Sequence, residues 1–342
     1  MSLSGKEKIV LNEIVKQFIE IASPVSSSSV AQKRKVNMSP ATIRNIMANL
    51  EKRGFLSQPY TSAGRVPETS AYREYVDHLM TKSRLSVDEK EQINEPIHQS
   101  SGEIEDILKD VTKILAHLSR QLGVIVTPQI EEGLFQRMEL VALSSNRIMM
   151  IITIESGLIK TIKLEIETQI SGDKLYLISQ ILNERLNGMK IIDIRQKFRD
   201  VVKDIRNEES GIVKMISTRA DRLFDFGENI DLYFMGTQNI FQQPDFVDDV
   251  RTISSVVELL ESQEIAAPML KQIAVPEATS VQIGDEFDEE RMQDCSMITA
   301  RYKVGNVSGV LGIIGPKRMN YSKLVSLVDF TARMITDIHG RN

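Results

Sequence analysis

The chain has 342 residues, of which 42% are hydrophobic and 26% are charged, and this size and composition predict two or three globular domains. The net charge of −5 conceals a basic beginning, since residues 1–80 contain 11 Lys and Arg against 7 Asp and Glu, whereas the remainder contains 31 against 40. No apolar run reaches the roughly 18–20 residues of a membrane-spanning helix and no signal-peptide pattern opens the chain, so we expect a cytoplasmic protein with no membrane partner.

The basic N-terminal part begins with two predicted helices. Apolar residues at helical spacing predict an amphipathic helix over residues 6–21, and Pro24 lies beyond its end. The serines at 26–29 offer N-caps for a short second helix that ends near Lys33. A basic turn, Arg34-Lys35, follows it.

A third helix is predicted over residues 39–53, because both of its ends carry specific signals. The Ser39 hydroxyl can accept a hydrogen bond from a free backbone N–H of the first turn. Pro40 suits the first helical position, where its missing N–H costs nothing. Gly54 can adopt the left-handed conformation that ends a helix.

This third helix has an apolar face and an opposite face of small and polar residues. The apolar face, which we expect to pack on the first two helices, holds Ile43, Ile46, Met47 and Leu50. The other face and its flanks hold Ala41, Thr42, Arg44, Asn45, Ala48, Asn49 and Lys52. Small residues permit close approach to a surface, Asn can pair with adenine, Arg can bind guanine or phosphate, and Thr and Lys can bind phosphate.

A β-hairpin is predicted directly after this helix. The stretch FLSQP favours a strand, and YTSAGRVP favours a polar turn and a returning strand, with Gly64 at the turn and Arg65 at the tip. Three helices and such a wing predict a winged helix-turn-helix in which residues 39–53 form the recognition helix. The candidate DNA-binding residues are Ser39, Thr42, Arg44, Asn45, Asn49, Lys52, Thr61, Ser62 and Arg65. Two alternatives stay open: the polar face is a solvated surface, or Arg44 forms a salt bridge within its own domain.

Residues 71–80 favour a connecting helix. Residues 81–102 are polar and contain Pro96, and they predict a linker or a helix with frayed ends. The rest of the chain predicts an α+β sheet domain with an insertion, because strands are followed by a helical zone and then by strands again. The expected elements are a helix over 103–122, strands over 136–144, 147–155 and 158–166, helical segments over 172–226 and 246–262, strands over 280–284, 296–304 and 307–314, and a last helix over 321–338.

Residues that could support catalysis are sparse, and we expect no enzymatic activity. Cys295 is the only cysteine, which excludes an intrachain disulfide, and we interpret it as a small buried thiol because no histidine lies near it in the sequence. None of the four histidines has another His or Cys at ligand spacing, so we expect no metal and no cofactor. The glycines of GVLGIIG, residues 309–315, lack the spacing of a dinucleotide-binding loop and favour a closely packed strand.

Short motifs along nearly the whole chain resemble the HrcA family of bacterial heat-inducible transcription repressors. In the N-terminal part they are SPATIRN at 39–45, LE..G at 50–54, QP.TSAGR.P at 58–67 and YR.YVD at 72–77. In the remainder they are NIFQQPDF at 239–246, IGDE at 283–286, DCSMI at 294–298 and G.LG.IGP.RM.Y at 309–321. The sequence departs from the usual family pattern at Ile46, Tyr60, Lys317 and the serines 26–29.

The resemblance implies three domains. We expect a winged-helix domain at 1–80, a linker at 81–102, a GAF-like domain at 103–168 and 227–342, and an inserted dimerisation domain at 169–226. It also implies that the protein binds an inverted repeat of the CIRCE type in double-stranded DNA as a homodimer and represses the operons of the DnaK and GroEL chaperones. The GroEL chaperonin is the implied folding modulator. Two other hypotheses stay open: a ligand-responsive repressor with the GAF-like domain as sensor, and an enzyme with an accessory winged helix.

Overall fold

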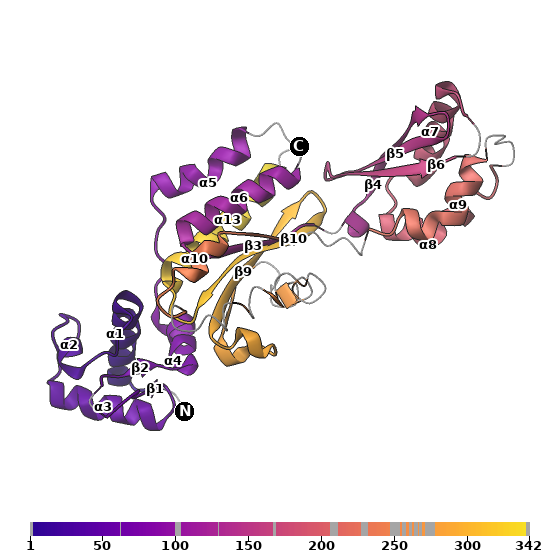
Figure 1. Cartoon of the computed structure of the whole chain (residues 1–342). Coiled ribbons are helices and arrows are strands. Elements are labelled where there is room, and N and C mark those ends of the chain that lie inside the picture. Colours follow the sequence, from indigo (N-terminus) through magenta and orange to yellow (C-terminus); the bar gives the residue numbers. More distant parts are fainter. Residues whose placement is uncertain are drawn as a thin grey trace.

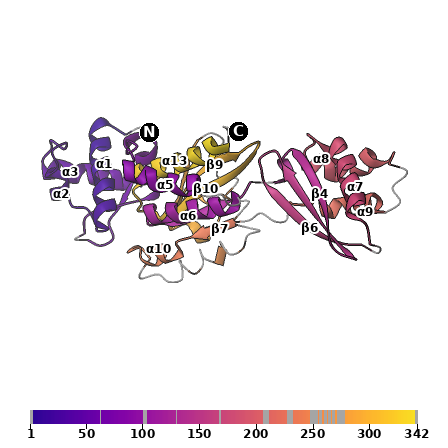
Figure 2. The same cartoon turned by 90° about the horizontal axis from the view of Figure 1, so that it is seen from above.

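The computed structural model describes residues 3–61, 63–99, 104–128, 130–166, 169–205, 211–226, 232–246 and 278–339, with isolated residues between 254 and 270. Three parts follow one another in space (Figures 1 and 2). We call them the head, the central sheet unit and the distal unit. None of the described helices is long and apolar enough to cross a membrane.

The head contains three helices and a small antiparallel hairpin, as the sequence predicts. Its elements are α1 (Gly5–Ile21), α2 (Ser27–Ala31), α3 (Pro40–Lys52), β1 (Leu56–Ser57) and β2 (Val66–Pro67). Serine N-caps begin two of these helices. At α2, Ser26 Oγ accepts from Ser29 N at 3.1 Å, and at α3, Ser39 Oγ accepts from Thr42 N at 3.2 Å. Two elements then lead out of the head, α4 (Thr69–Glu74) and a π-helical turn η1 (Tyr75–Leu79).

The central sheet unit is built on an antiparallel sheet in the order β7-β3-β10-β9-β8. Its strands are β3 (Leu122–Val126), β7 (Leu232–Met235), β8 (Ser280–Ile283), β9 (Cys295–Val304) and β10 (Val307–Pro316). Its helices are α5 (Val87–Gln99), α6 (Ile104–Ser119), α10 (Thr237–Phe241) and α13 (Tyr321–His339), with short 3₁₀ turns η3 (Gly284–Glu286) and η4 (Glu290–Met292). Helices α6 and α13 lie on one face of the sheet, and α5 packs on both of them (Figure 1).

The glycine-rich stretch 309–315 is a strand, as predicted. It lies in β10 at the centre of the sheet, between β3 and β9. A Cβ on Gly312 would lie 2.4 Å from the carbonyl oxygen of Ile298, so only glycine permits this close approach of two backbones.

Among the residues that the structure describes, the distal unit has a separate three-stranded sheet and three helices. Its elements are a 3₁₀ turn η2 (Ile130–Glu132), β4 (Phe135–Ser144), β5 (Arg147–Ile154), β6 (Ile159–Glu165), α7 (Gly172–Leu186), α8 (Ile191–Val202) and α9 (Ile212–Leu223). Helix α7 is fastened to β4 by side chains: Asn183 Oδ1 accepts from Met138 N at 2.6 Å, and Ser179 Oγ accepts from Leu140 N at 3.0 Å. The unit projects from the central sheet on the side away from the head (Figure 2).

Three sequence expectations differ from this architecture. Strands β4 to β6 pair with one another and not with β8 to β10, so the boundary expected at 168/169 falls inside the distal unit. Of the two alternatives for residues 81–102, the helix is the one formed, since residues 87–99 are α5; it differs from a linker in that it buries Ile93 and Ile97. Strands β3 and β7 went unpredicted, because a continuous apolar run such as that of β3 lacks the alternation of a half-buried strand. The helix expected at 246–262 lies mostly outside the described residues.

Candidate nucleic-acid interface

The two faces of α3 are separated as the sequence predicts. Ile43, Met47 and Leu50 are buried in the head, and Ile46 packs against them from a partly exposed position. The exposed polar and charged side chains of α3 are Thr42, Arg44, Asn45, Asn49 and Lys52. Polar donors and two cations therefore project from one side of a helix whose other side is fixed in the core.

The beginning of α3 adds two linked hydroxyls to this surface. Ser39 Oγ lies 2.9 Å from Thr42 Oγ1, and both residues are exposed. The free backbone N–H groups of a first helical turn carry partial positive charge, which suits an anion such as a phosphate. The candidates Ser39 and Thr42 therefore lie at the end of α3 that attracts anions.

Cations on this side of the head are not neutralised. No carboxylate of the described chain lies within ion-pair distance of Arg44 or Lys52. The salt bridge considered for Arg44 is thus not formed among these residues. Arg34 and Lys35, in the turn before α3, are also exposed and carry no such partner. The sequence identified this basic turn, but the candidate residues did not include it.

The loop between β1 and β2 is held closed by one glutamine. Gln58 Nε2 donates to the carbonyl oxygens of Thr61 at 2.9 Å and Ala63 at 3.0 Å. Tyr60 and Thr61 are consequently presented to solvent at the end of the loop. Ser62, also a candidate, lies outside the described residues.

Arg65 lies at the base of this loop, so its predicted position at the tip is wrong. Its backbone pairs with that of Val25, with N–O distances of 2.8 and 2.9 Å. Its guanidinium donates to Glu51 of α3, from Nε at 2.9 Å, and its side chain is only 16% exposed. The backbone pairing with Val25 places Arg65 at the base of the loop, and the carboxylate of Glu51 attracts its guanidinium inwards.

A second ion pair lies at the same, C-terminal end of α3. Arg53 Nη1 lies 3.1 Å from Glu7 Oε1, and Glu7 also forms a capping box with Ser4 at the beginning of α1. The hydrogen bonds from Ser4 and the charge of Arg53 lower the pKa of Glu7. The pair joins α1 to the end of α3 and so holds the exposed face of α3 in place.

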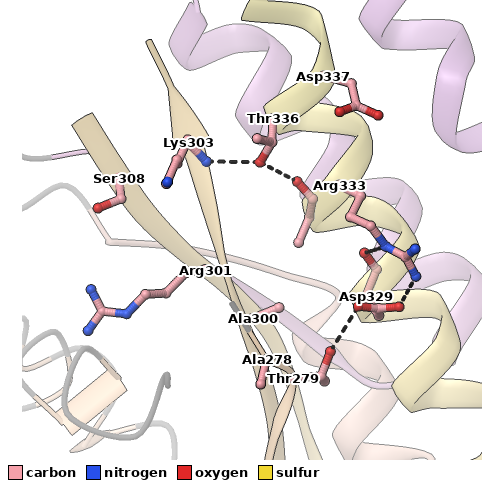
Figure 3. A pocket seen from close by; sticks show the side chains of 11 residues that line it. Ala278, Thr279, Ala300, Arg301, Lys303, Ser308, Asp329, Arg333, Thr336 and Asp337 are labelled. Carbon is pink, nitrogen blue, oxygen red and sulfur yellow. Dashed lines mark hydrogen bonds and ion pairs between the residues drawn. The ribbon is translucent and has the colours of Figure 1, made fainter. Parts of the chain in front are cut away.

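The central sheet unit has a shallow cleft that could be considered for a small ligand. It lies between β9 and α13 and has a volume of about 360 Å³ (Figure 3). Several of its polar groups bind one another: Arg333 pairs with Asp329, and Thr336 Oγ1 accepts from the backbone N of Lys303 at 3.0 Å.

Elsewhere in the central sheet unit, Cys295 is buried as predicted. Burial raises the pKa of its thiol to about 12, which keeps the thiol protonated at neutral pH.

Comparisons with known proteins agree over the whole chain. The family model "HrcA protein C terminal domain" matches residues 105–325. The heat-inducible transcription repressor HrcA of Prosthecochloris aestuarii is 34% identical, with 97% of this chain and 96% of that protein covered. Its counterpart in Chlorobaculum tepidum is 35% identical, with 99% of both covered. A crystal structure of a hypothetical protein, at 21% identity, has the same fold, with a TM-score of 0.64 and 99% of both chains covered. The chain therefore belongs to the HrcA family of heat-inducible transcription repressors.

Proposed function

We propose that this repressor acts on the operons of the DnaK and GroEL chaperones, by binding a CIRCE-type inverted repeat in double-stranded DNA as a homodimer. The observation that carries the proposal is the exposed face of α3, where Asn45 and Asn49 lie beside Arg44 and Lys52, two cations that have no ion-pair partner in the part of the chain that the structure describes. The operator and the regulated genes in this proposal are those that the resemblance to the HrcA family implies.

In this proposal the head is a winged helix-turn-helix domain with α3 as recognition helix and the β1–β2 loop as wing. Asn45 and Asn49 read base edges in the major groove, where an amide can make two hydrogen bonds to adenine. Arg44, Lys52, Ser39 and Thr42 bind phosphates or base edges beside them. Thr61 and Ser62 of the wing contact the DNA backbone or the minor groove. Arg65 supports the wing through Glu51.

The other two units have proposed roles in assembly. The central sheet unit is GAF-like in this proposal, and the distal unit is the inserted dimerisation domain, extended to about residues 130–226 to include its own sheet. A two-fold operator is matched by a two-fold dimer that presents one recognition helix to each half-site. Helix α7 supports this role, since it exposes Tyr176, Leu177 and Ile181, which are 63%, 59% and 38% exposed.

The resemblance also implies a route for induction. The GroEL chaperonin assists the folding of the repressor, so unfolded proteins that occupy the chaperonin lower the amount of active repressor. The chaperone operons are then transcribed until free chaperonin returns. In this proposal the central sheet unit needs no small-molecule effector.

Salt-titrated DNA binding tests the proposal. Purified wild type, Asn45→Ala, Lys52→Ala and the control Lys163→Ala, which changes an exposed lysine of β6, are titrated with the inverted repeat and with a scrambled duplex. We expect Asn45→Ala to weaken binding to the repeat by about 10- to 100-fold, corresponding to about 1–3 kcal/mol for a bidentate base contact. Binding of the scrambled duplex should change little.

Lys52→Ala should weaken binding to both duplexes and reduce the salt slope by about one unit, as expected for one phosphate contact. Lys163→Ala should behave as wild type. Equal, weak binding of both duplexes by the wild type, with and without added chaperonin, would contradict the proposed function.

A further inference from the structure

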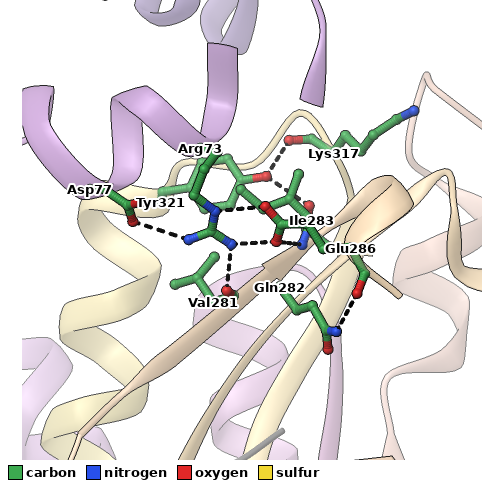
Figure 4. Close-up of polar contacts among 9 residues, drawn as sticks. Arg73, Asp77, Val281, Gln282, Ile283, Glu286, Lys317 and Tyr321 are labelled. Atoms are coloured by element: carbon green, nitrogen blue, oxygen red, sulfur yellow. Dashed lines mark hydrogen bonds and ion pairs between the residues drawn. The ribbon is translucent and has the colours of Figure 1, made fainter. Parts of the chain in front are cut away.

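The head is joined to the central sheet unit by an arginine that crosses the boundary between them. Arg73 of α4 donates from Nε to Glu286 Oε1 at 2.7 Å, and its Nη2 pairs with Glu286 Oε2 (Figure 4). Nη2 also donates to the carbonyl oxygen of Val281 at 2.7 Å, and Nη1 donates to Asp77 at 3.1 Å. The fork-shaped guanidinium is thus bound on all sides, in a geometry that tolerates little rotation.

The carboxylate that receives Arg73 is held in position by its own unit. Glu286 Oε2 accepts from Ile283 N at 2.9 Å, and the backbone oxygen of Glu286 accepts from Gln282 Nε2 at 2.7 Å. Ile283 thus holds the carboxylate at the end of β8 from within the central sheet unit, and Gln282 holds the backbone of the same residue. A pre-positioned acceptor costs less conformational entropy when the pair forms.

A second arginine also crosses this boundary, but it belongs to the central sheet unit and contacts the head. Arg318 of the central sheet unit binds Asp245, with Nη2 2.7 Å from Oδ2, and its Nη1 donates to the carbonyl oxygen of Ile19 at 2.8 Å. Ile19 lies in the last turn of α1, where carbonyl oxygens lack helical partners and where α1 has no basic residue of its own. Arg318 therefore supplies a cation at the negative end of α1, and it is only 11% exposed.

Buried aromatic rings lie between the two arginine contacts. Tyr72 of α4 and Tyr321 of α13 are almost completely buried, and their ring centroids are 5.9 Å apart. Exclusion of water strengthens nearby ion pairs, because the effective dielectric constant is lower there. In the sequence, residues 80–86 form the covalent connection from the head to α5, and they have no regular secondary structure.

We propose that Arg73 and Arg318 are positioning residues that lock the head at one angle to the rest of the molecule, and so set the half-site spacing that the repressor accepts. This inference rests on the proposed binding of a dimer to an inverted repeat. While both arginine contacts are formed, the central sheet units and distal units of the dimer determine the distance and rotation between the two α3 helices. With the lock broken, the head loses its charged contacts to the central sheet unit and keeps the contact of Tyr72 with Tyr321 and the segment 80–86, in which Ser83 N donates to the carbonyl oxygen of Ser322 at 3.0 Å. The two heads then adapt to other spacings at the cost of effective concentration.

The lock is tested first without DNA. Spin labels at Gln32→Cys in the head and Lys163→Cys in the distal unit report one distance within a chain, in protein diluted with unlabelled chains; both sites are exposed, whereas the native Cys295 is buried. We expect a narrow distance distribution in wild type and a broad one in Arg73→Ala and in Glu286→Gln, which removes the charge but keeps the shape. A distribution that stays narrow in both variants would overturn the inference, whatever the DNA experiments give.

The dependence of DNA affinity on half-site spacing is tested with four duplexes. They are a single half-site, the inverted repeat, and repeats with two or five base pairs added at the centre. Five base pairs turn one half-site by about half a helical turn. We expect wild type and the control Arg137→Ala, an exposed arginine of β4, to lose at least about 30-fold in affinity for the five-base-pair variant. Arg73→Ala and Glu286→Gln should lose less than about threefold relative to their own affinity for the natural repeat. Half-site affinity should stay within about twofold of wild type in every variant that keeps its head folded.

Every result of these two experiments counts for or against the inference. Unchanged spacing dependence in Arg73→Ala and Glu286→Gln overturns the inference but leaves the proposed function standing. If the wild-type protein binds the repeat no better than the half-site, the proposed function is overturned, and so is the proposed control of half-site spacing. If Arg73→Ala fails to fold, Glu286→Gln and Arg318→Lys provide the same comparison, with the half-site affinity as the check on the fold of the head.

Discussion

Arg65 at the base of the β1–β2 loop and Glu51 in the last turn of α3 form an ion pair, in which Nε and Nη2 lie 2.9 Å and 2.8 Å from the same carboxylate oxygen. The ion pair therefore joins the loop and the helix that we propose to contact DNA. The backbone pairing of Arg65 with Val25 extends this connection to the segment between α1 and α2. The ion pair and the backbone bridge thus connect the elements of the proposed DNA-binding surface.

Removing this ion pair should weaken DNA binding through position and not through charge. We expect Arg65→Ala and Glu51→Gln each to weaken operator binding about fivefold, as the loss of about 1 kcal/mol of ion-pair energy would give. The salt slope should not change in Arg65→Ala, because the guanidinium is occupied by Glu51. A slope that falls by about one unit in Arg65→Ala, with tighter binding by Glu51→Gln, would instead assign Arg65 to a phosphate.

The capping box of α1 should make the stability of the head depend on pH. Hydrogen bonds from Ser4 and the charge of Arg53 hold the pKa of Glu7 below its ordinary value of 4.5 in the folded protein. Because the folded pKa is the lower one, the stabilisation is present above about pH 4.5 and disappears as the pH falls through the folded pKa. Glutamine keeps the capping box but removes the charge that pairs with Arg53, so we expect Glu7→Gln to lower the free energy of unfolding by about 1 kcal/mol at pH 7 and by progressively less towards pH 3.

Urea unfolding of wild type and Glu7→Gln at a series of pH values measures this difference. Glu20→Gln, which changes an exposed carboxylate of the same helix, is the control and should stay close to wild type. A difference between wild type and Glu7→Gln that grows as the pH falls would be incompatible with a depressed pKa.

The exposed apolar face of α7 should be required for dimerisation. A glutamate at Leu177 or Ile181 would bury a charge in an apolar contact, so we expect Leu177→Glu to be monomeric at micromolar concentrations by light scattering. Gln196→Glu introduces the same charge on the exposed side of α8 and should leave the dimer intact. A dimeric Leu177→Glu, or a monomeric wild type, would exclude this face as the dimer interface.

The close approach at the centre of the sheet should make Gly312 irreplaceable. Alanine would place its Cβ 2.4 Å from a backbone oxygen of β9 that cannot move without breaking strand pairing. We expect Gly312→Ala to lower the free energy of unfolding by about 2 kcal/mol or more, measured by thermal or urea unfolding. Gly172→Ala, at the start of α7, meets no atom within 4 Å and should be neutral or slightly stabilising. Equal stability of the two variants would contradict the packing described for β10.

The sequence alone predicted those features that depend on neighbours a few residues away. The boundaries of α3 follow from Ser39, Pro40 and Gly54, because a cap or a stop is a property of one turn of backbone. The buried and exposed faces of the helix follow from its 3.6-residue period. Short motifs in a fixed order also indicated the family, which the comparisons with known repressors then established.

Only the tertiary structure decided which distant groups meet. Strands β4 to β6 have the pattern of strands, but a pattern does not name the partner, and they form their own sheet instead of joining the C-terminal strands. Arg65 has the residue type of a phosphate contact, yet a carboxylate 14 positions earlier in the chain draws it inwards. Arg73 and Glu286 are 213 positions apart, and each is part of a recognisable motif, but nothing local links the two. Strand partners and ion pairs depend on how the chain packs on itself, and that information is not contained in any short stretch of sequence.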